Sequence, residues 1–192
     1  MRDRVFAGYV LTVAFAYASL FGYISGSSFA LQEQYGLTAT QFSVVFAANA
    51  GGMVALGLLN ARLVRRFAVR RILVVGLATS TVAAVVLLVT VIGTRHGLAV
   101  VLPLLFLVVA SRGLVSANAT VLGVGRAPHA AGSASAVLGA CMFAGAIVVS
   151  PLLALGAEEP AAPMVAVVSV GALAALLSTV VLARGDRDLA TR

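Results

Sequence analysis

The stretch Ile72–Thr94 reads ILVVGLATSTVAAVVLLVTVIGT and contains no charged side chain. A helix needs about 20 predominantly apolar residues to cross the roughly 30 Å hydrocarbon core of a bilayer, so this stretch is long enough to span a membrane. Arg70 and Arg71 precede it and Arg95 follows it, which places the nearest charges at its two ends. In water such a surface would aggregate, whereas in a bilayer it faces a solvent as apolar as itself. The chain is therefore expected to be an integral membrane protein.

Five further apolar runs of similar length occupy most of the 192 residues. Hydrophobic residues make up 61% of the chain, well above the ~45–50% of an ordinary soluble domain. We therefore expect residues 1–192 to form one all-α transmembrane domain of six helices, whose short connections make consecutive helices antiparallel neighbours. Three helices followed by three more are compatible with a 3+3 inverted repeat. The predicted spans are Val5–Leu31, Thr40–Leu59, Ile72–Thr94, Leu98–Leu122, Gly132–Leu155 and Met164–Ala183.

Arginine supplies all 13 basic residues, and its distribution predicts the orientation. With a cytoplasmic N-terminus, only Arg95 lies in an outer connection. The positive-inside rule then places both termini in the cytoplasm. This distribution also attributes the net charge of +7 to membrane topology rather than to nucleic-acid binding. The arginines assigned to the cytoplasmic side are Arg2, Arg4, Arg62, Arg65, Arg66, Arg70, Arg71, Arg126, Arg184, Arg187 and Arg192.

Residues with catalytic chemistry are scarce. The two histidines, His96 and His129, fall on opposite sides of the predicted membrane, so no membrane-buried serine can pair with a histidine base. Cys141 is the only cysteine, and its spacing from the histidines is unlike that of metal ligands. The chain also lacks lysine and any phosphate-cradling glycine loop. We expect no enzyme activity, no cofactor and no metal.

Arg112 is the one charged residue inside the six apolar runs, and no Asp or Glu accompanies it there. A charge deep in a bilayer costs about 2.5–3.5 kcal/mol on insertion scales, so it requires an explanation. Its side chain could snorkel towards the cytoplasmic headgroups or a water-filled vestibule, or make a structural hydrogen bond. The alternative is a direct part in substrate binding or ion coupling.

Polar and aromatic side chains recur at helical spacing along the first run. Thr12, Phe15, Ser19 and Tyr23 fall near one face of the predicted helix. This face is either a packing surface between helices or the lining of a substrate cavity.

Two amides and three adaptable apolar side chains extend the candidate site to other runs. Asn49 and Asn118 need hydrogen-bond partners in lipid, so we expect each to reach a neighbouring helix or a wet cavity. Met53, Met142 and Phe143 are of the kind that promiscuous binding surfaces use, with core packing as the alternative.

The fifth run carries small residues at every fourth position: Gly132, Ala136, Ala140 and Ala144. Such a ribbon lets a neighbouring backbone approach closely. We expect it to be a helix-packing surface, which in a transporter is also where helices slide.

The segment Gly57–Arg66, GLLNARLVRR, resembles the loop signature G-x-L-x-D-R-x-G-R-R of the major facilitator superfamily. Ala61 and Val64 replace the Asp and the second Gly of the signature, a degenerate form typical of the copy in the second half of these transporters. The resemblance implies that the arginines lock a cytoplasmic gate. The matching positions are Gly57, Leu59, Arg62, Arg65 and Arg66.

Three further stretches resemble the Bcr/CflA branch of the drug:proton antiporters. They are YISGSSFALQEQYGLTATQFSVVFAANA from Tyr23, GLVSANATVLGV from Gly113 and AGSASAVLGA from Ala131. In that family all three belong to the C-terminal six of twelve helices, so the chain is expected to be such a half: a fragment, a truncated product or one member of a split transporter. Ser28 and Ala117 stand where that family has prolines, and Arg112 is not a residue of its pattern.

The resemblance implies multidrug efflux by alternating access and proton antiport in the bacterial cytoplasmic membrane. Small amphipathic drugs would be held between two six-helix halves. The expected partners are the bilayer and an N-terminal half, in the same or a separate chain, or a second copy. The family's coupling carboxylates lie in the N-terminal half. The alternatives are a homodimer that carries a solute without protons and a non-transporting membrane partner or remnant. The residues expected to face the cavity are Phe15, Ser19, Tyr23, Asn49, Met53, Met142 and Phe143.

Overall fold

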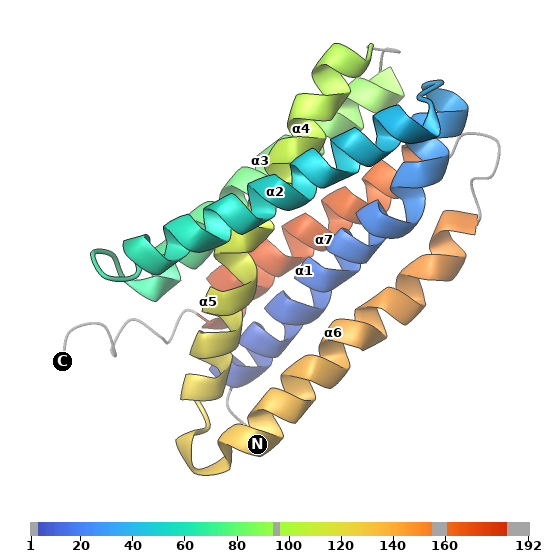
Figure 1. Cartoon of the computed structure of the whole chain (residues 1–192). Coiled ribbons are helices and arrows are strands. Elements are labelled where there is room, and N and C mark those ends of the chain that lie inside the picture. Colours follow the sequence, from blue (N-terminus) through green and yellow to red (C-terminus); the bar gives the residue numbers. More distant parts are fainter. Residues whose placement is uncertain (1–3, 94–96, 155–160, 184–192) are drawn as a thin grey trace.

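The computed structural model describes residues 4–93, 97–154 and 161–183, in which all regular secondary structure is helical (Figure 1). Six helical segments are long and apolar enough to cross a membrane, which confirms the predicted all-α, six-helix fold. The elements are α1 Arg4–Phe29, the π-helical turn η1 Ala30–Gln34, α2 Ala39–Leu63, α3 Val69–Gly93, α4 Leu98–Ala110, α5 Arg112–Gly125, the 3-10 turn η2 Pro128–Ala130, α6 Ala131–Ala154 and α7 Ala161–Val181. Outside the described residues lie the predicted helix ends Thr94 and Leu155 and the residues Arg2, Arg95, His96, Arg184, Arg187 and Arg192.

Several helices extend past the apolar runs. α2 continues to Leu63 rather than ending at Leu59, so Asn60 and Arg62 belong to the helix itself. α1 likewise passes through η1 to Gln34. Backbone groups near a membrane must be paired within the segment, whereas polar side chains at its ends can reach the interface. The apolar run therefore marks only the part of each helix that crosses the hydrocarbon.

The start of α2 is specified locally. Gly36 adopts a φ of 71°, a left-handed conformation that favours glycine. The Thr38 hydroxyl then accepts a hydrogen bond from the Gln41 N–H at 3.3 Å, and the Gln41 side chain accepts one from the Thr38 N–H at 2.9 Å. This capping box pairs two backbone donors that the first turn would otherwise leave open.

The fourth span, Leu98–Gly125, is interrupted at Ser111, which separates α4 from α5. The Ser111 hydroxyl donates to the Leu107 carbonyl, and the Leu114 N–H donates to the Ser111 carbonyl at 3.0 Å, as in a 3-10 turn. The interruption lies directly before Arg112, the first residue of α5.

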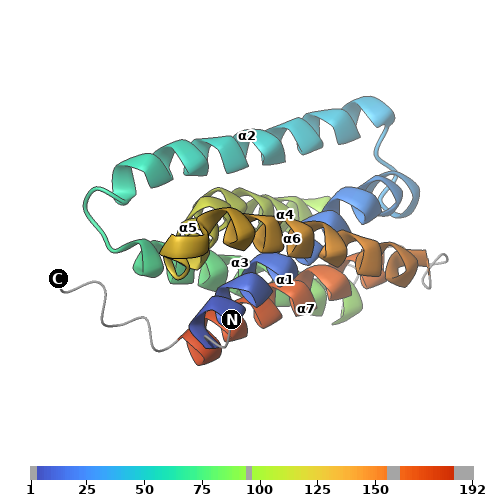
Figure 2. The same ribbon diagram turned by 90° about the horizontal axis from the view of Figure 1, so that it is seen from below.

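The helices lie side by side in an order unlike their order in the chain. α1 packs mainly against α7 and α6, α7 also packs against α3, and α3 contacts α4 and α5. α2 packs on α4 and α5, and in Figure 1 α1 lies between α2 and α6, the outermost helix on the other side. Seen from below, α2 lies on the side of the bundle away from α1 and α7 (Figure 2).

The two edge helices are much less covered than the others. Only 11% of the apolar window is buried in the second span and in the fifth, against 39% in the first, 44% in the fourth and 50% in the third and the last. Leu58 on α2 and Ile147 on α6, for example, are 68% and 74% exposed. Both edges therefore present apolar helix surface that no described residue covers.

Small residues bring α1 and α7 close together. A Cβ on Gly26 would lie 2.7 Å from Cγ of Met164, and a Cβ on Gly171 would lie 2.8 Å from Cβ of Ser19. Such contacts are shorter than real side chains allow, so glycine is what permits this approach of the backbones.

The ribbon of small residues on the fifth span does not lie on the face of α6 that packs within the bundle. α6 packs within the bundle through Ala134, Leu138 and Val149, which are buried. The ribbon residues are all exposed instead, and nothing lies within 4 Å of a Cβ placed on Gly132. Within the described residues, this ribbon packs against no neighbouring helix. Its members are Gly132, Ala136, Ala140 and Ala144.

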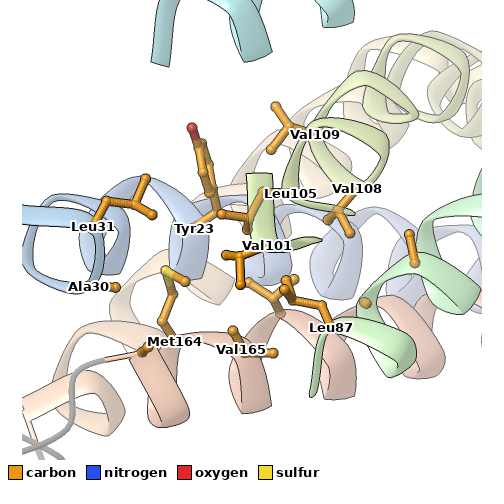
Figure 3. Packing of buried hydrophobic residues seen from close by; sticks show 14 of the residues in the cluster. Tyr23, Ala30, Leu31, Leu87, Val101, Leu105, Val108, Val109, Met164 and Val165 are labelled. Atoms are coloured by element: carbon orange, nitrogen blue, oxygen red, sulfur yellow. The ribbon is translucent and has the colours of Figure 1, made fainter. Parts of the chain in front are cut away.

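Buried apolar side chains form two clusters along the bundle. The larger joins the end of α1 to α3, α4 and α7 around Tyr23, Leu87, Leu105 and Met164 (Figure 3). The second lies around Tyr9, nearer the start of α1, and includes residues of α3, α5, α6 and α7. The polar contacts described next lie beside these clusters.

Candidate functional site

Arg112 is buried between α5 and α1, with 3% of its surface exposed. Its Nη2 donates a hydrogen bond of 2.7 Å to the Ser19 hydroxyl, which in turn donates to the Val168 carbonyl of α7 at 2.8 Å. The hydroxyl of Ser19 thus links the guanidinium to α7. Of the two structural roles considered for Arg112, the buried hydrogen bond matches this geometry.

The rest of the Arg112 guanidinium has no partner among the described residues. Its Nε and Nη1 are buried without a hydrogen bond. Glu33, in η1 at the end of the first span, is the only acidic residue in the described ranges, and it does not pair with Arg112. A buried donor left unpaired costs about 1–3 kcal/mol, and more when it is charged. Arg112 therefore carries two buried donors whose desolvation no described residue offsets.

Tyr23 and Asn49 connect α1 to α2. The Asn49 amide donates to the Tyr23 hydroxyl at 2.8 Å, and both residues are buried. The Tyr23 ring stacks on Phe46, with centroids 5.8 Å apart, and Phe42 packs against Phe46 in turn. In Figure 3 the hydroxyl of Tyr23 points away from Met164, Val165 and the other apolar side chains. An aromatic body with a paired polar tip is suited to the boundary of a cavity.

A second amide contact joins α2 to α5. Asn118 donates to the Asn60 side-chain oxygen at 2.7 Å, and Asn60 donates back at 3.4 Å. Next to this pair the helices cross so closely that a Cβ on Gly113 would lie 2.2 Å from the Met53 carbonyl and 2.6 Å from the Gly57 nitrogen. The crossing therefore requires glycine at position 113.

The remaining candidates for the cavity lie apart from these contacts. Phe15 lines a groove of about 600 Å³ that is formed by α1, α6 and α7. The lining of this groove is almost wholly apolar. Phe143 is 60% exposed on α6, with its ring 6.4 Å from that of Phe21. Met142 packs half-buried against the second core cluster. Among the described residues, the predicted cavity residues are thus brought to several places rather than one pocket.

The loop signature forms a basic surface. Arg62 lies in the last turn of α2, where a cation is favoured by the helix dipole, and Arg65 and Arg66 follow in the turn. The three arginines line a cavity of about 690 Å³ together with Leu63 and Phe67. Gly57 lies a turn and a half earlier, at the crossing with α5.

The sequence reasoning missed Asn60 and Gly113. Asn60 occupies a variable position of the loop signature and was assigned to a connection, because the apolar run ends at Leu59. Asn118 lies in an apolar run and needs a polar partner on another helix. The amide of Asn60, next to the end of a second apolar run, is the signal that could have identified this partner. Gly113 carries no such signal, since glycine is frequent in membrane helices.

No described group of three or more His, Cys, Asp or Glu side chains could hold a metal. What the bundle does offer is a set of buried polar contacts between helices that are otherwise apolar, flanked by two uncovered edges. Residues 1–151 match the Major Facilitator Superfamily. The chain belongs to this family. With six apolar helices, it is an integral membrane protein.

Two relatives place the chain within that family of transporters. It is 33% identical over 173 residues, or 90% of its length, to an uncharacterised MFS-type transporter, YdgK, of Bacillus subtilis (strain 168). It is 27% identical over 163 residues, or 85% of its length, to a bicyclomycin resistance protein homolog of Haemophilus influenzae (strain ATCC 51907 / DSM 11121 / KW20 / Rd). The matches cover 42% and 41% of these relatives, so the chain spans about two fifths of their length.

Proposed function

We propose that this chain forms the C-terminal six-helix half of a Bcr/CflA-type transporter that exports small amphipathic drugs in exchange for protons. The two halves would expose a shared cavity alternately to each side of the membrane. The second half would be an N-terminal six-helix unit, in the same or a separate chain. Both termini of this half would lie on the cytoplasmic side of a bacterial cell membrane.

The observation that carries the proposal is the uncovered surface of α2 and α6. Each has 11% of its apolar window buried, and the two helices lie apart with α1 and α5 between them (Figure 1). A second half that packs on both edges would enclose the surface of the helices between them. Enclosing a cavity at the interface of two units is the usual construction of a transport site.

Tyr23 and Asn49 are the cavity residues that the proposal favours most, because they are joined at the boundary of α1 and α2. Ser19 and Met53 contact residues of α5. Phe15 lines the groove next to α6, the helix that carries Met142 and Phe143. In this proposal Arg62, Arg65 and Arg66 close the cytoplasmic gate by pairing with acidic groups of the other half.

Drug efflux is suggested by the relative named for bicyclomycin resistance. The six predicted apolar runs contain no Asp or Glu. A membrane carboxylate that binds and releases the exchanged proton would therefore belong to the other half. Amphipathic substrates suit a cavity with aromatic rings and few polar groups.

The same lack of carboxylates favours a second candidate. Two copies of the chain could form a homodimer that carries a solute without proton coupling, each covering the edge helices of the other. A unit that binds but moves nothing would differ from both transporters in having no water-filled cavity.

Accessibility of single cysteines tests alternating access. In a Cys141→Ser background, a cysteine would replace Ala117, which is exposed on α5, and a control cysteine would replace Val89, which is 66% exposed on α3. We expect a membrane-impermeant maleimide to label position 117 from either side of the membrane and position 89 from neither, since α3 faces lipid. Absence of labelling at position 117 from both sides would contradict transport.

Efflux of bicyclomycin from cells that express the protein separates the two transport candidates. A proton-coupled exporter moves the drug out of the cell against the drug's concentration gradient. It stops doing so when an ionophore collapses the proton gradient. A homodimeric carrier without coupling equilibrates the drug at the same rate before and after the ionophore is added.

A further inference from the structure

Arg112 is a buried cation whose hydrogen bonds are incomplete. It is 3% exposed, and its Nε and Nη1 have no partner among the described residues. Ser19 accepts one hydrogen bond from Nη2 and donates its own to the Val168 carbonyl, so this hydroxyl orients the guanidinium without neutralising it.

The free N–H groups specify the chemistry of the missing partner. A guanidinium is a planar fork whose donors match the two oxygens of a carboxylate. A neutral acceptor would complete the hydrogen bonds but leave the charge uncompensated in a medium of low dielectric. The only acidic residue of the described ranges is Glu33, in η1, so the anion has to come from elsewhere.

Partly exposed residues lie near Arg112 in the chain of α5 and near Ser19 in the chain of α1. One turn further along α5, Ser116 is half-buried and Ala117 is exposed, while Tyr17 is half-buried on α1. The Ser116 hydroxyl donates to the Arg112 backbone carbonyl at 3.4 Å, within the helix. α1 and α5 are also the helices between the two edges that the second half is proposed to cover.

We propose that Arg112, oriented by Ser19, binds the carboxylate of a transported solute, so that amphipathic organic acids belong to the substrates of this protein. The inference rests on the proposed transport function and adds a substrate class to it. Arg112 is the residue that contacts the anion, and Ser19 is a positioning residue. In this proposal the solute reaches Arg112 past Tyr17 and Ser116.

Benzoate is a suitable probe, with benzamide as its neutral isostere and sodium chloride as the control for ionic strength. The measurement is the thermal unfolding of the full-length protein, purified in detergent, as a function of probe concentration. We expect a saturable rise in Tm with benzoate but not with benzamide or sodium chloride. Arg112→Gln should abolish the rise, and Arg71→Gln, which removes an exposed arginine, should preserve it.

Arg112→Lys keeps the positive charge but loses the planar fork of donors. This variant replaces Arg112→Gln in the benzoate titration if Arg112→Gln does not fold. Its apparent Kd for benzoate should rise about tenfold, as expected for the loss of one charge-assisted hydrogen bond. The inference is overturned if benzoate leaves the Tm of the wild type unchanged, if Arg112→Gln or Arg112→Lys responds as the wild type does, or if sodium chloride produces the same shift.

Binding and transport are separate readouts. Bicyclomycin efflux without a benzoate response would overturn this inference alone. A benzoate response that requires Arg112, in a protein that moves no drug, would overturn the proposed function alone.

Discussion

Helices α6 and α7 both pack against α1, and both are apolar along their whole length, yet this chain covers them very differently. Half of the apolar window of α7 is buried, against 11% of that of the fifth span, which contains α6. α7 uses Gly171, Ser169 and Thr179 for contacts with α1 and α3, whereas the ribbon of small residues on α6 from Gly132 to Ala144 is exposed. Lipid is as apolar as these side chains, so hydrophobicity does not distinguish a covered helix from an open one. The distinction comes from close contacts and hydrogen bonds.

The largest difference is expected from adding a side chain to a glycine of each helix. Gly171→Leu on α7 would force a Cβ to within 2.8 Å of Ser19 Cβ and 2.9 Å of the Phe15 carbonyl, whereas nothing lies within 4 Å of such an atom at Gly139 on α6. We expect Gly171→Leu to lower the free energy of unfolding by about 3 kcal/mol. SDS-induced unfolding in mixed micelles measures it, with Gly139→Leu as the control. Equal effects of the two variants would refute the asymmetry.

Truncating an apolar side chain should produce a smaller difference. Met164 on α7 is 1% exposed and packs against Gly26, while Ile147 on α6 is 74% exposed. Met164→Ala leaves a cavity and should cost about 2 kcal/mol of unfolding free energy. Ile147→Ala should cost less than about 0.5 kcal/mol, as is usual for an uncovered position. The same unfolding assay compares them, and a larger loss for Ile147→Ala would mean that α6 is covered within this chain.

Hydrogen bonds between helices should contribute less again. The Thr179 and Thr12 hydroxyls lie 2.8 Å apart, whereas the Ser150 hydroxyl on α6 bonds only within its own helix, to the Ala146 carbonyl at 3.3 Å. Thr179→Val should lower the free energy of unfolding by about 0.6 kcal/mol, the average for interhelical hydrogen bonds measured in a membrane protein. Ser150→Ala should leave it unchanged within error. If Thr179→Val unfolds with the midpoint of the wild type, the bond adds nothing to stability.

The smallest effect on stability is expected from Ala140→Leu, in the exposed ribbon of α6. No described helix packs there, so SDS-induced unfolding of the six-helix unit should not change. Drug efflux by the complete transporter should fall at least severalfold if the second half packs on this ribbon. Val75→Leu on α3, where the side chain is 59% exposed, is the control and should preserve efflux. Unchanged efflux in Ala140→Leu would place the partner elsewhere.

Much of the fold follows from run lengths. The segment Ile72–Thr94 is long enough to cross a bilayer and has no charge, and α3 covers its described part. The break at Ser111 was not predicted, because hydropathy counts apolar side chains and does not register a backbone interruption between Ala110 and Arg112. The end of α2 was placed four residues early for a related reason, since polar residues such as Arg62 can belong to a helix at the membrane surface.

The candidate site was harder to predict than the fold. Asn49 was expected to find a partner in another helix, and that partner is Tyr23. Phe15 was grouped with Ser19 on helical spacing, but Ser19 faces the α7 backbone while Phe15 lines the groove between α6 and α7. A spacing rule tells which residues share a face of one helix, and the rotation of that helix in the bundle remains free.

The amino-acid sequence was sufficient to predict a membrane protein of the all-α class with six spans. The reason is that the thickness of a bilayer sets the length of an apolar run. The sequence also singled out Arg112 as a buried charge, since a charge in a span is costly wherever the helices pack. The bundle was needed to pair Arg112 with Ser19, 93 residues away, and Asn60 with Asn118, 58 residues away. Helices that are apolar on every side carry no amphipathic pattern, so their faces are chosen by contacts between helices rather than by contact with solvent.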